Sequence, residues 1–284
     1  MARGILAFAL AALAPAALAA PPAPPPVPPG ALDEPWPAPD PNTWWTDERP
    51  KPSEAADPLA GRRVGRNAPA PARVGADPLL YRLWSLPPLQ AETLKGGEMI
   101  LELWVRPSLT VRQAVVRIVV RRDGDAFVQG RAGLGCCTPE IGRRVGFDAK
   151  LEPGWSARLT KLRDDPLWDA PRDVRVVEAE SSTDSICVNG VAYDLVLVTP
   201  EKSRGVRRAC DQAEVGQAAD VLEAMLGAAL GHDPRFDVVF PKGADFASDR
   251  RAYQALVSAG GALKPAAHAR PQPEAPEPAP PPAE

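Results

Sequence analysis

Apolar and polar residues alternate after residue 98, and this period of two is typical of β-strands that bury one face. Between the second and third strand lies Asp123-Gly124, a dipeptide that favours a two-residue type I′ hairpin turn. The pattern therefore predicts an antiparallel meander. Its strands are expected over residues 99–106, 111–121, 126–132 and 145–151.

A spacing of three and four residues between apolar positions then predicts three helices. The first covers residues 155–163, and the last covers 248–259, before Gly260-Gly261. The longest helix covers residues 211–230 and should begin with Asp211 as its N-cap. Glu214 has the spacing of the reciprocal capping residue, and Gly231 should end the helix.

Further strands are expected between and after these helices, and Asn189-Gly190 favours a second hairpin turn. Strands in hairpin order followed by helices predict an α+β fold, with a hairpin-rich antiparallel sheet covered on one face by two or three helices. The additional strands are expected over residues 174–179, 185–188, 191–198, 205–210 and 238–240.

Most of the 36 prolines lie towards the two ends of the 284-residue chain. Residues 20–76 and 265–284 lack a helical or strand period, so disordered proline-rich arms are expected around one domain at residues 77–264. Trp44 and Trp45 form an apolar island in the first arm. Their indoles can fold back onto the domain or dock on a partner, and both alternatives stay open.

The first 19 residues have the pattern of an export signal. Arg3 precedes an apolar run, and Ala17-Leu18-Ala19 supplies the small residues of a cleavage site. The run is too short for a permanent membrane span, which disfavours the alternative of an uncleaved anchor. We therefore expect cleavage after Ala19 and a periplasmic or secreted protein with no transmembrane segment in its mature form.

The net charge of −3 gives no electrostatic reason to expect nucleic acid as a partner. The four cysteines, in an oxidising compartment, predict two disulfides. Cys187 with Cys210 is the favoured pair and leaves Cys136 with Cys137. A strand between Cys187 and Cys210 would separate them by roughly 10 Å, so the two crossed pairings stay open.

The adjacent Cys136 and Cys137 also allow a thiol redox or soft-metal function. Neither a Cys-x-x-Cys spacing nor a flanking histidine accompanies them. No catalytic triad or phosphate-binding glycine loop is present, and His232 follows the end of a predicted helix. Asp164 and Asp165 form the one carboxylate pair considered for catalysis, and they also suit a turn before Pro166. We therefore predict no catalytic residue, metal or cofactor.

Two arginine groups could recognise an anion, because guanidinium groups match carboxylate and phosphate geometry. The alternative is a solvated sheet face on which these arginines pair with Glu98, Glu102 and Asp125. The first group, on the predicted hairpin, comprises Arg117, Arg121, Arg122 and Arg131, and the second, beyond the cysteine loop, comprises Arg143 and Arg144. The same two interpretations apply to Arg204, Arg207 and Arg208.

These observations favour a non-enzymatic exported protein that binds an envelope protein or an anionic envelope component. The thiol redox or soft-metal function is the main alternative. A third interpretation is a spacer between envelope layers, in which the proline-rich arms supply the length. Oligomeric state does not follow from the sequence.

Overall fold

The computed structural model describes residues 53–62, 74–107, 112–134, 144–178, 190–240 and 242–266. The predicted signal at 1–19, Trp44 and Trp45, and the tail beyond 266 lie outside the described residues. So do the predicted strand at 185–188 and Asn189.

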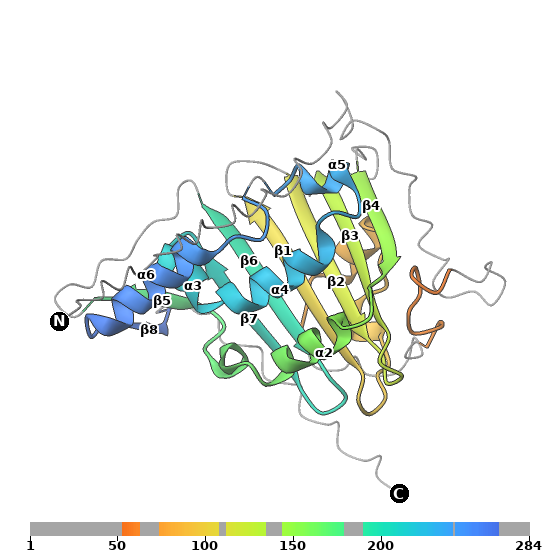
Figure 1. Cartoon of the computed structure of the whole chain (residues 1–284), viewed down its shortest axis with the longest axis horizontal. Helices are drawn as coiled ribbons and strands as arrows, with labels where there is room; N and C mark the ends of the chain where they lie inside the picture. Colours follow the sequence, from red (N-terminus) through yellow and green to blue (C-terminus); the bar gives the residue numbers. More distant parts are fainter. Residues whose placement is uncertain are drawn as a thin grey trace, which may run out of the picture.

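Six strands form the main sheet, in the order β4-β3-β2-β1-β6-β7, and all neighbouring strands are antiparallel (Figure 1). The structure thus confirms the antiparallel sheet and the α+β class that the alternating pattern predicted. The strands are β1 Met99–Pro107, β2 Arg112–Val120, β3 Ala126–Leu134, β4 Arg144–Lys150, β6 Val191–Val198 and β7 Ser203–Ala209.

A second, two-stranded sheet pairs β5 (Val174–Val177) with β8 (Ala262–Pro265). β5 was expected as a strand, whereas β8 was not, because Gly260-Gly261 was expected to close the last element of the domain and Pro265 was assigned to the proline-rich tail. The pairing brings the end of the domain back beside residues that precede β6. Figure 1 shows this small sheet beyond β7, next to α3 (Gln212–Gln217) and α6 (Ala247–Ser258).

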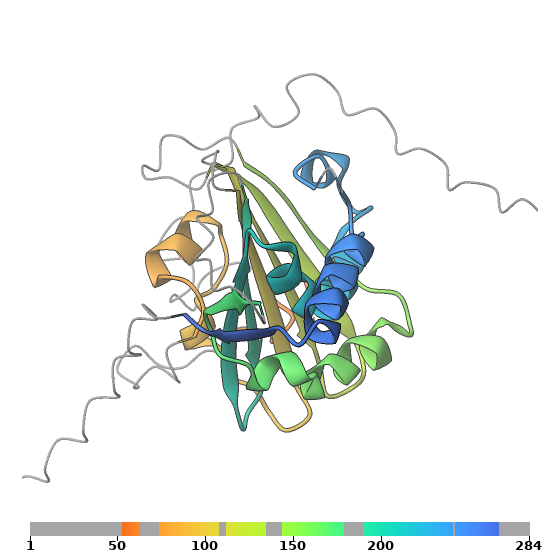
Figure 2. The same ribbon diagram turned by 90° about the vertical axis from the view of Figure 1, so that its left-hand side faces the viewer.

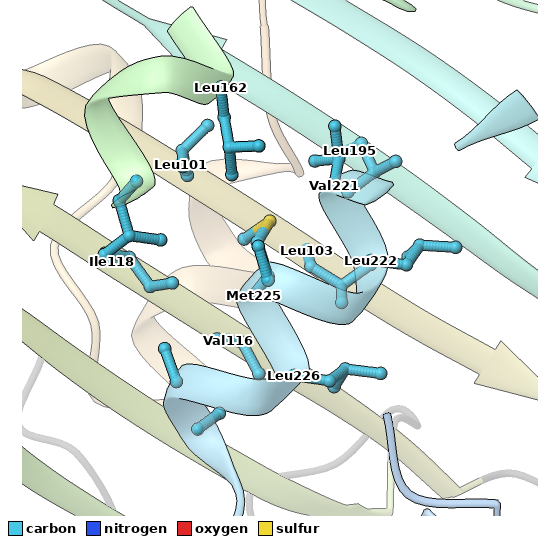
Figure 3. Packing of buried hydrophobic residues seen from close by; sticks show 14 of the residues in the cluster. Leu101, Leu103, Val116, Ile118, Leu162, Leu195, Val221, Leu222, Met225 and Leu226 are labelled. Carbon is cyan, nitrogen blue, oxygen red and sulfur yellow. The ribbon is translucent and has the colours of Figure 1, made fainter. Parts of the chain in front are cut away.

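One face of the main sheet is covered by helices, and α4 (Ala219–Ala229) crosses the central strands. Its Leu222, Met225 and Leu226 are fully buried against inward-facing side chains such as Leu103 and Val116 (Figure 3). The remaining helical segments are α2 Trp155–Thr160, α5 Pro234–Asp237, and the 3₁₀ turns η2 Lys161–Asp164 and η3 Pro166–Asp169.

The opposite face of the sheet is covered too, which corrects the expectation of a sheet covered on one face. Residues 53–62 and 74–94, here called the N-terminal segment, contain α1 (Pro78–Leu83) and η1 (Leu89–Ala91). Figure 2 shows α1 on the other side of the strands from α4 and α6. Its buried Tyr81 and Trp84 join a second apolar cluster with sheet residues. Part of the stretch expected as a disordered arm therefore packs on the domain.

The β2–β3 hairpin has a different turn from the one expected. Arg121 N–H donates to the Asp125 carbonyl at 2.9 Å, and Gly124 N–H donates to the Arg121 carbonyl at 3.1 Å. These bonds leave three residues in the loop, of which only Gly124 has a positive φ, at +89°. A type I′ turn needs two left-handed residues, so the Asp-Gly pair was placed correctly but assigned the wrong turn.

The helix predicted over residues 211–230 is broken into α3 and α4 at Ala218, whose φ and ψ are −97° and 3°. The predicted ends are confirmed, since the Asp211 side chain accepts from the Ala213 amide at 2.7 Å and Gly231 has φ +94°. The strand expected at 238–240 is wrong. α5, which is capped by Asp233 and begins with a proline, ends just before this stretch, and the turns that follow it carry Phe240 into the core.

Candidate functional site

A groove of about 790 Å³ lies between β5, the start of α3 and α6. Small and aliphatic side chains make up most of its lining. The charged residues that line it, Glu178 and Asp211, are both acidic. The groove is lined by Val176, Glu178, Cys210, Asp211, Gln212, Ala213, Ala252, Ala255, Leu256, Ala259 and Gly261.

The close approach of α3 to α6 positions one wall of this groove. Gly216 lies against the backbone of Asp249, where an added Cβ would stand 2.0 Å from the carbonyl oxygen. Only a residue without a side chain permits this packing, because real Cβ contacts do not fall below about 3 Å. The contact holds α6 so that Ala252, Ala255 and Ala259 line the groove along one helix face.

Cys210 lies at the junction of β7 and α3, and it has an unusual backbone conformation with φ +67°. Its sulfur takes part in a disulfide. The three cysteines that can be its partner, Cys136, Cys137 and Cys187, lie outside the described residues. The pairing of Cys187 with Cys210 therefore stays a prediction, and the crossed pairings stay open with it.

The acidic lining has a local structural cause at Asp211. Its carboxylate accepts hydrogen bonds from the amides of Ala213 and Glu214, at 2.7 and 3.3 Å, and so caps α3. The predicted reciprocal bond from Glu214 to the Asp211 amide is not formed. That amide donates instead to the Ala209 carbonyl at 2.7 Å, while Glu214 accepts from the Ala209 amide at 3.4 Å.

Glu214 is buried behind the groove, at 8 % exposure. Burial raises the pKa of its carboxyl to about 7, the Ala209 amide lowers it, and the nearby Asp211 raises it further. The neighbouring Arg208 is also fully buried and reaches Gln217 at 2.8 Å and the Arg172 carbonyl at 2.9 Å. Burial lowers the pKa of Arg208 to about 10. Both groups belong to the interior rather than to the surface of the groove.

The predicted anion-binding arginines of the first hairpin have internal partners. Arg117 is 1 % exposed and bonds Glu102 through Nε at 2.8 Å and Nη2 at 2.6 Å. An anion from solution does not reach this guanidinium beneath the N-terminal segment. The alternative of a cross-strand pair with Glu102 is the arrangement found, although the pair is buried and not solvated.

Arg131 and Arg121 are paired as well. Arg131 is 6 % exposed at its side chain and contacts Asp148 at 2.6 Å, whereas the more exposed Arg121 contacts Asp123 and Glu54. Arg143 and the Arg144 side chain lie outside what the structure describes. Of the other expected partners, Glu98 pairs with Arg62 at 2.7 Å, and Asp125 pairs with Lys150 at 2.6 Å.

The remaining chemical candidates have structural roles. His232 Nε2 lies 3.2 Å from the Ala228 carbonyl at the end of α4, and its ring stacks on Phe147 with centroids 5.0 Å apart. Asp165 caps η3 by accepting from the Leu167 amide at 2.9 Å. This capping agrees with the turn that was weighed against a catalytic pair with Asp164.

Within the described ranges, no three metal-binding side chains come together, and no helix has the length and apolarity needed to cross a bilayer. Comparisons of this chain with protein-family models, with curated proteins and with solved structures found no match. The groove was not among the predicted sites. Its sequence signal was the spacing of Ala252, Ala255 and Ala259, which reads equally well as an ordinary helix face.

Proposed function

We propose that this protein is exported, is not an enzyme, and binds an apolar segment of another envelope protein in the groove between β5 and α6. The observation that carries the proposal is the groove itself, whose volume of about 790 Å³ lies within the usual range of ligand sites. Its alanines present a surface onto which larger apolar side chains of a partner can pack.

The charge of the lining supports a more specific ligand. Glu178 and Asp211 are acidic, and the described lining contains no basic residue. A lysine or arginine beside the apolar residues of the partner would therefore be attracted to the groove, whereas an acidic segment would be repelled. The proposed ligand is a segment in which a short apolar run adjoins a basic residue.

Export is part of this proposal and rests on the sequence of the first 19 residues. It predicts a mature N-terminus at Ala20 in the envelope fraction of the producing cell. N-terminal sequencing of the protein purified from that fraction tests this directly. An intact Met1 in the cytosolic fraction would contradict export.

The binding proposal is tested by placing a photo-crosslinking amino acid at Ala255 in the full-length chain, expressed in its own cell. The matched control carries the same group at Gln254, an exposed neighbour that does not line the groove. A third chain combines the crosslinker at Ala255 with Ala252→Leu, which fills the groove with a good helix former.

We expect a defined crosslinked product from position 255, a weaker or absent one from position 254, and loss of the product with Ala252→Leu. Peptide mapping of the product should find an apolar run next to a basic residue. The proposal is wrong if positions 254 and 255 capture the same proteins, if Ala252→Leu changes nothing while circular dichroism shows a folded chain, or if the captured segment is acidic.

A further inference from the structure

A second hollow lies on the other face of the sheet, where β1, β6 and β7 meet residues 74–76 of the N-terminal segment. It is a pit of about 70 Å³, room for a small chemical group and not for a whole side chain of average size. The pit and the groove have no lining residue in common. The pit is lined by Val74, Gly75, Ala76, Trp104, Arg106, Arg172, Asp194, Leu195, Val196, Gly205 and Val206.

The register of the strands explains why a hollow exists here. Val196 on β6 stands opposite Gly205 on β7, and Trp104 on β1 stands opposite Asp194 on β6. Gly205 supplies no side chain, so the surface of the sheet between Val196 and the edge strand β7 is left uncovered. The buried indole of Trp104 forms one wall, so the pit has an apolar side and a charged side.

Arg106, Arg172 and Asp194 line the charged side of the pit, and Arg207 and Asp173 lie next to these residues without lining the pit. Arg106 is bound to Asp194, which leaves that carboxylate largely neutralised. Arg207 lies 3.9 Å from both Asp194 and Asp173, and Arg172 lies 3.8 Å from Asp173. These distances exceed the range of a hydrogen bond, so the arginines lie near the carboxylates without being hydrogen-bonded to them.

The guanidinium groups of Arg172 and Arg207 therefore keep donors available. Both side chains are about half exposed, at 55 % and 50 %, and no hydrogen bond from either guanidinium forms in the described part of the chain. A guanidinium fork binds a planar carboxylate through two parallel bonds. Three arginines and two aspartates give the cluster a net charge of +1. One singly charged anion balances this charge.

From these observations, we propose that the pit binds one carboxylate group against the wall formed by Trp104, held by Arg172 in the lining and by Arg207, which lies beside the lining residue Asp194. A doubly charged phosphate suits the site less well, because its second negative charge exceeds the single net positive charge of the cluster and the volume is small. The carboxylate can belong to a free small acid or to the C-terminus of a peptide. Both sources share the same recognition chemistry.

The test uses the full-length mature chain and follows the Arg Nε–Hε signals by NMR during titration with sodium acetate, acetyl-trialanine and acetyl-trialanine amide. Sodium chloride at equal ionic strength corrects for screening. We expect saturable shifts with at least one of the two carboxylates and none with the amide. Binding of acetate assigns the site to free acids, and binding of the tripeptide alone assigns it to a chain terminus.

Three variants make the test specific. Arg172→Gln and Arg207→Gln should each weaken binding by about tenfold, because each removes a charged hydrogen-bond donor. Arg204→Gln is the matched control. Arg204 is an exposed arginine of β7, the strand that carries Arg207, but it stands opposite Leu197 and points to the other face of the sheet. Gly205→Val should abolish binding while the strand stays intact, since the nearest atom to an added Cβ is 3.9 Å away.

The proposal is overturned if neither carboxylate gives a saturable shift, or if the amide binds as tightly as the acid. It is also overturned if Arg204→Gln weakens binding as much as Arg172→Gln, because the effect would then come from overall charge. Each of these results leaves the groove proposal untouched, and the crosslinking result at Ala255 is independent of the pit.

Discussion

Glu102 on β1 and Arg117 on β2 stand directly opposite each other in the sheet, and their side chains form an ion pair with at most 1 % exposure. The second oxygen of Glu102 accepts from the Tyr81 hydroxyl at 2.5 Å and from the Trp104 indole at 2.6 Å. The N-terminal segment supplies both the cover and one of these donors. The charged pair therefore depends on that segment to be sealed from water.

Glu102→Gln should lower the free energy of unfolding by about 3–5 kcal/mol, because it removes the carboxylate that is hydrogen-bonded to the buried Arg117 and leaves only Glu92, at 3.8 Å, to balance that charge. Urea denaturation followed by circular dichroism measures the change. Asp123→Asn is the matched control, since Asp123 pairs with Arg121 in a largely exposed loop and its loss should be minor. Equal effects of the two substitutions would argue against an important buried pair.

Tyr81→Phe should loosen the N-terminal segment. Burial, more than the nearby Glu102, raises the pKa of Tyr81, so its hydroxyl stays protonated and donates to Glu102 while accepting from the Ala76 amide at 2.9 Å. Loss of the hydroxyl should cost about 1–3 kcal/mol. In the Tyr81→Phe variant, hydrogen–deuterium exchange should become faster over residues 74–94 and stay unchanged in α6. The control variant is Tyr253→Phe, which removes a tyrosine hydroxyl from α6 and should leave exchange over residues 74–94 unchanged.

Gly216→Ala and Gly227→Ala should have opposite effects, although both replace a helical glycine by the best helix former. At Gly216 the new Cβ would meet the Asp249 carbonyl at 2.0 Å, so α3 and α6 must separate and the groove must lose its shape. At Gly227 the nearest atom belongs to Trp155, at an ordinary 3.5 Å. Thermal denaturation should show a lower melting temperature for Gly216→Ala, and an unchanged or higher one for Gly227→Ala.

Glu214 should make stability fall as the pH rises. Its pKa of about 7 in the folded protein exceeds the ordinary 4.5, so the folded state binds a proton that the unfolded state has already released. The contribution is complete below pH 4.5, declines between 4.5 and about 7, and is absent above that. Urea denaturation across this interval should show the decline, with a size on the order of 3 kcal/mol.

Glu214→Gln provides the comparison, because the amide is neutral at every pH. The variant should have a flatter dependence of stability on pH than the wild type and should be the more stable of the two near pH 8. A parallel decline in both proteins would assign the pH dependence to other groups.

The sequence predicted the main sheet well because alternation reports directly on which side of a strand is buried. Leu101, Leu103 and their partners face the helices as the period of two requires. The same rule failed for Glu102 and Arg117, which occupy the polar phase and were expected to face solvent. Apolar residues on the same face, Ile100, Trp104, Val115 and Val119, do indicate that this face is covered. They do not indicate which segment of the chain covers it.

The groove and the pit escaped prediction for a related reason. Each is made where a side chain is missing or small, at Gly205 in the pit and at Ala255 in the groove. Small residues leave no pattern of their own, and the space beside them depends on the register of strands and on the approach of α3 to α6. Both are properties of the tertiary structure.

The position of β1 also has a kinetic consequence. One of its edges pairs with β2, across a short connection, while the other pairs with β6, where Ile100 meets Val198 about a hundred residues along the chain. Closing so long a loop is entropically costly and slow. During synthesis, the strands from β1 to β4 can associate while the outer edge of β1 waits for β6, and in that interval the nascent sheet exposes an unprotected edge to which chaperones or other chains can bind.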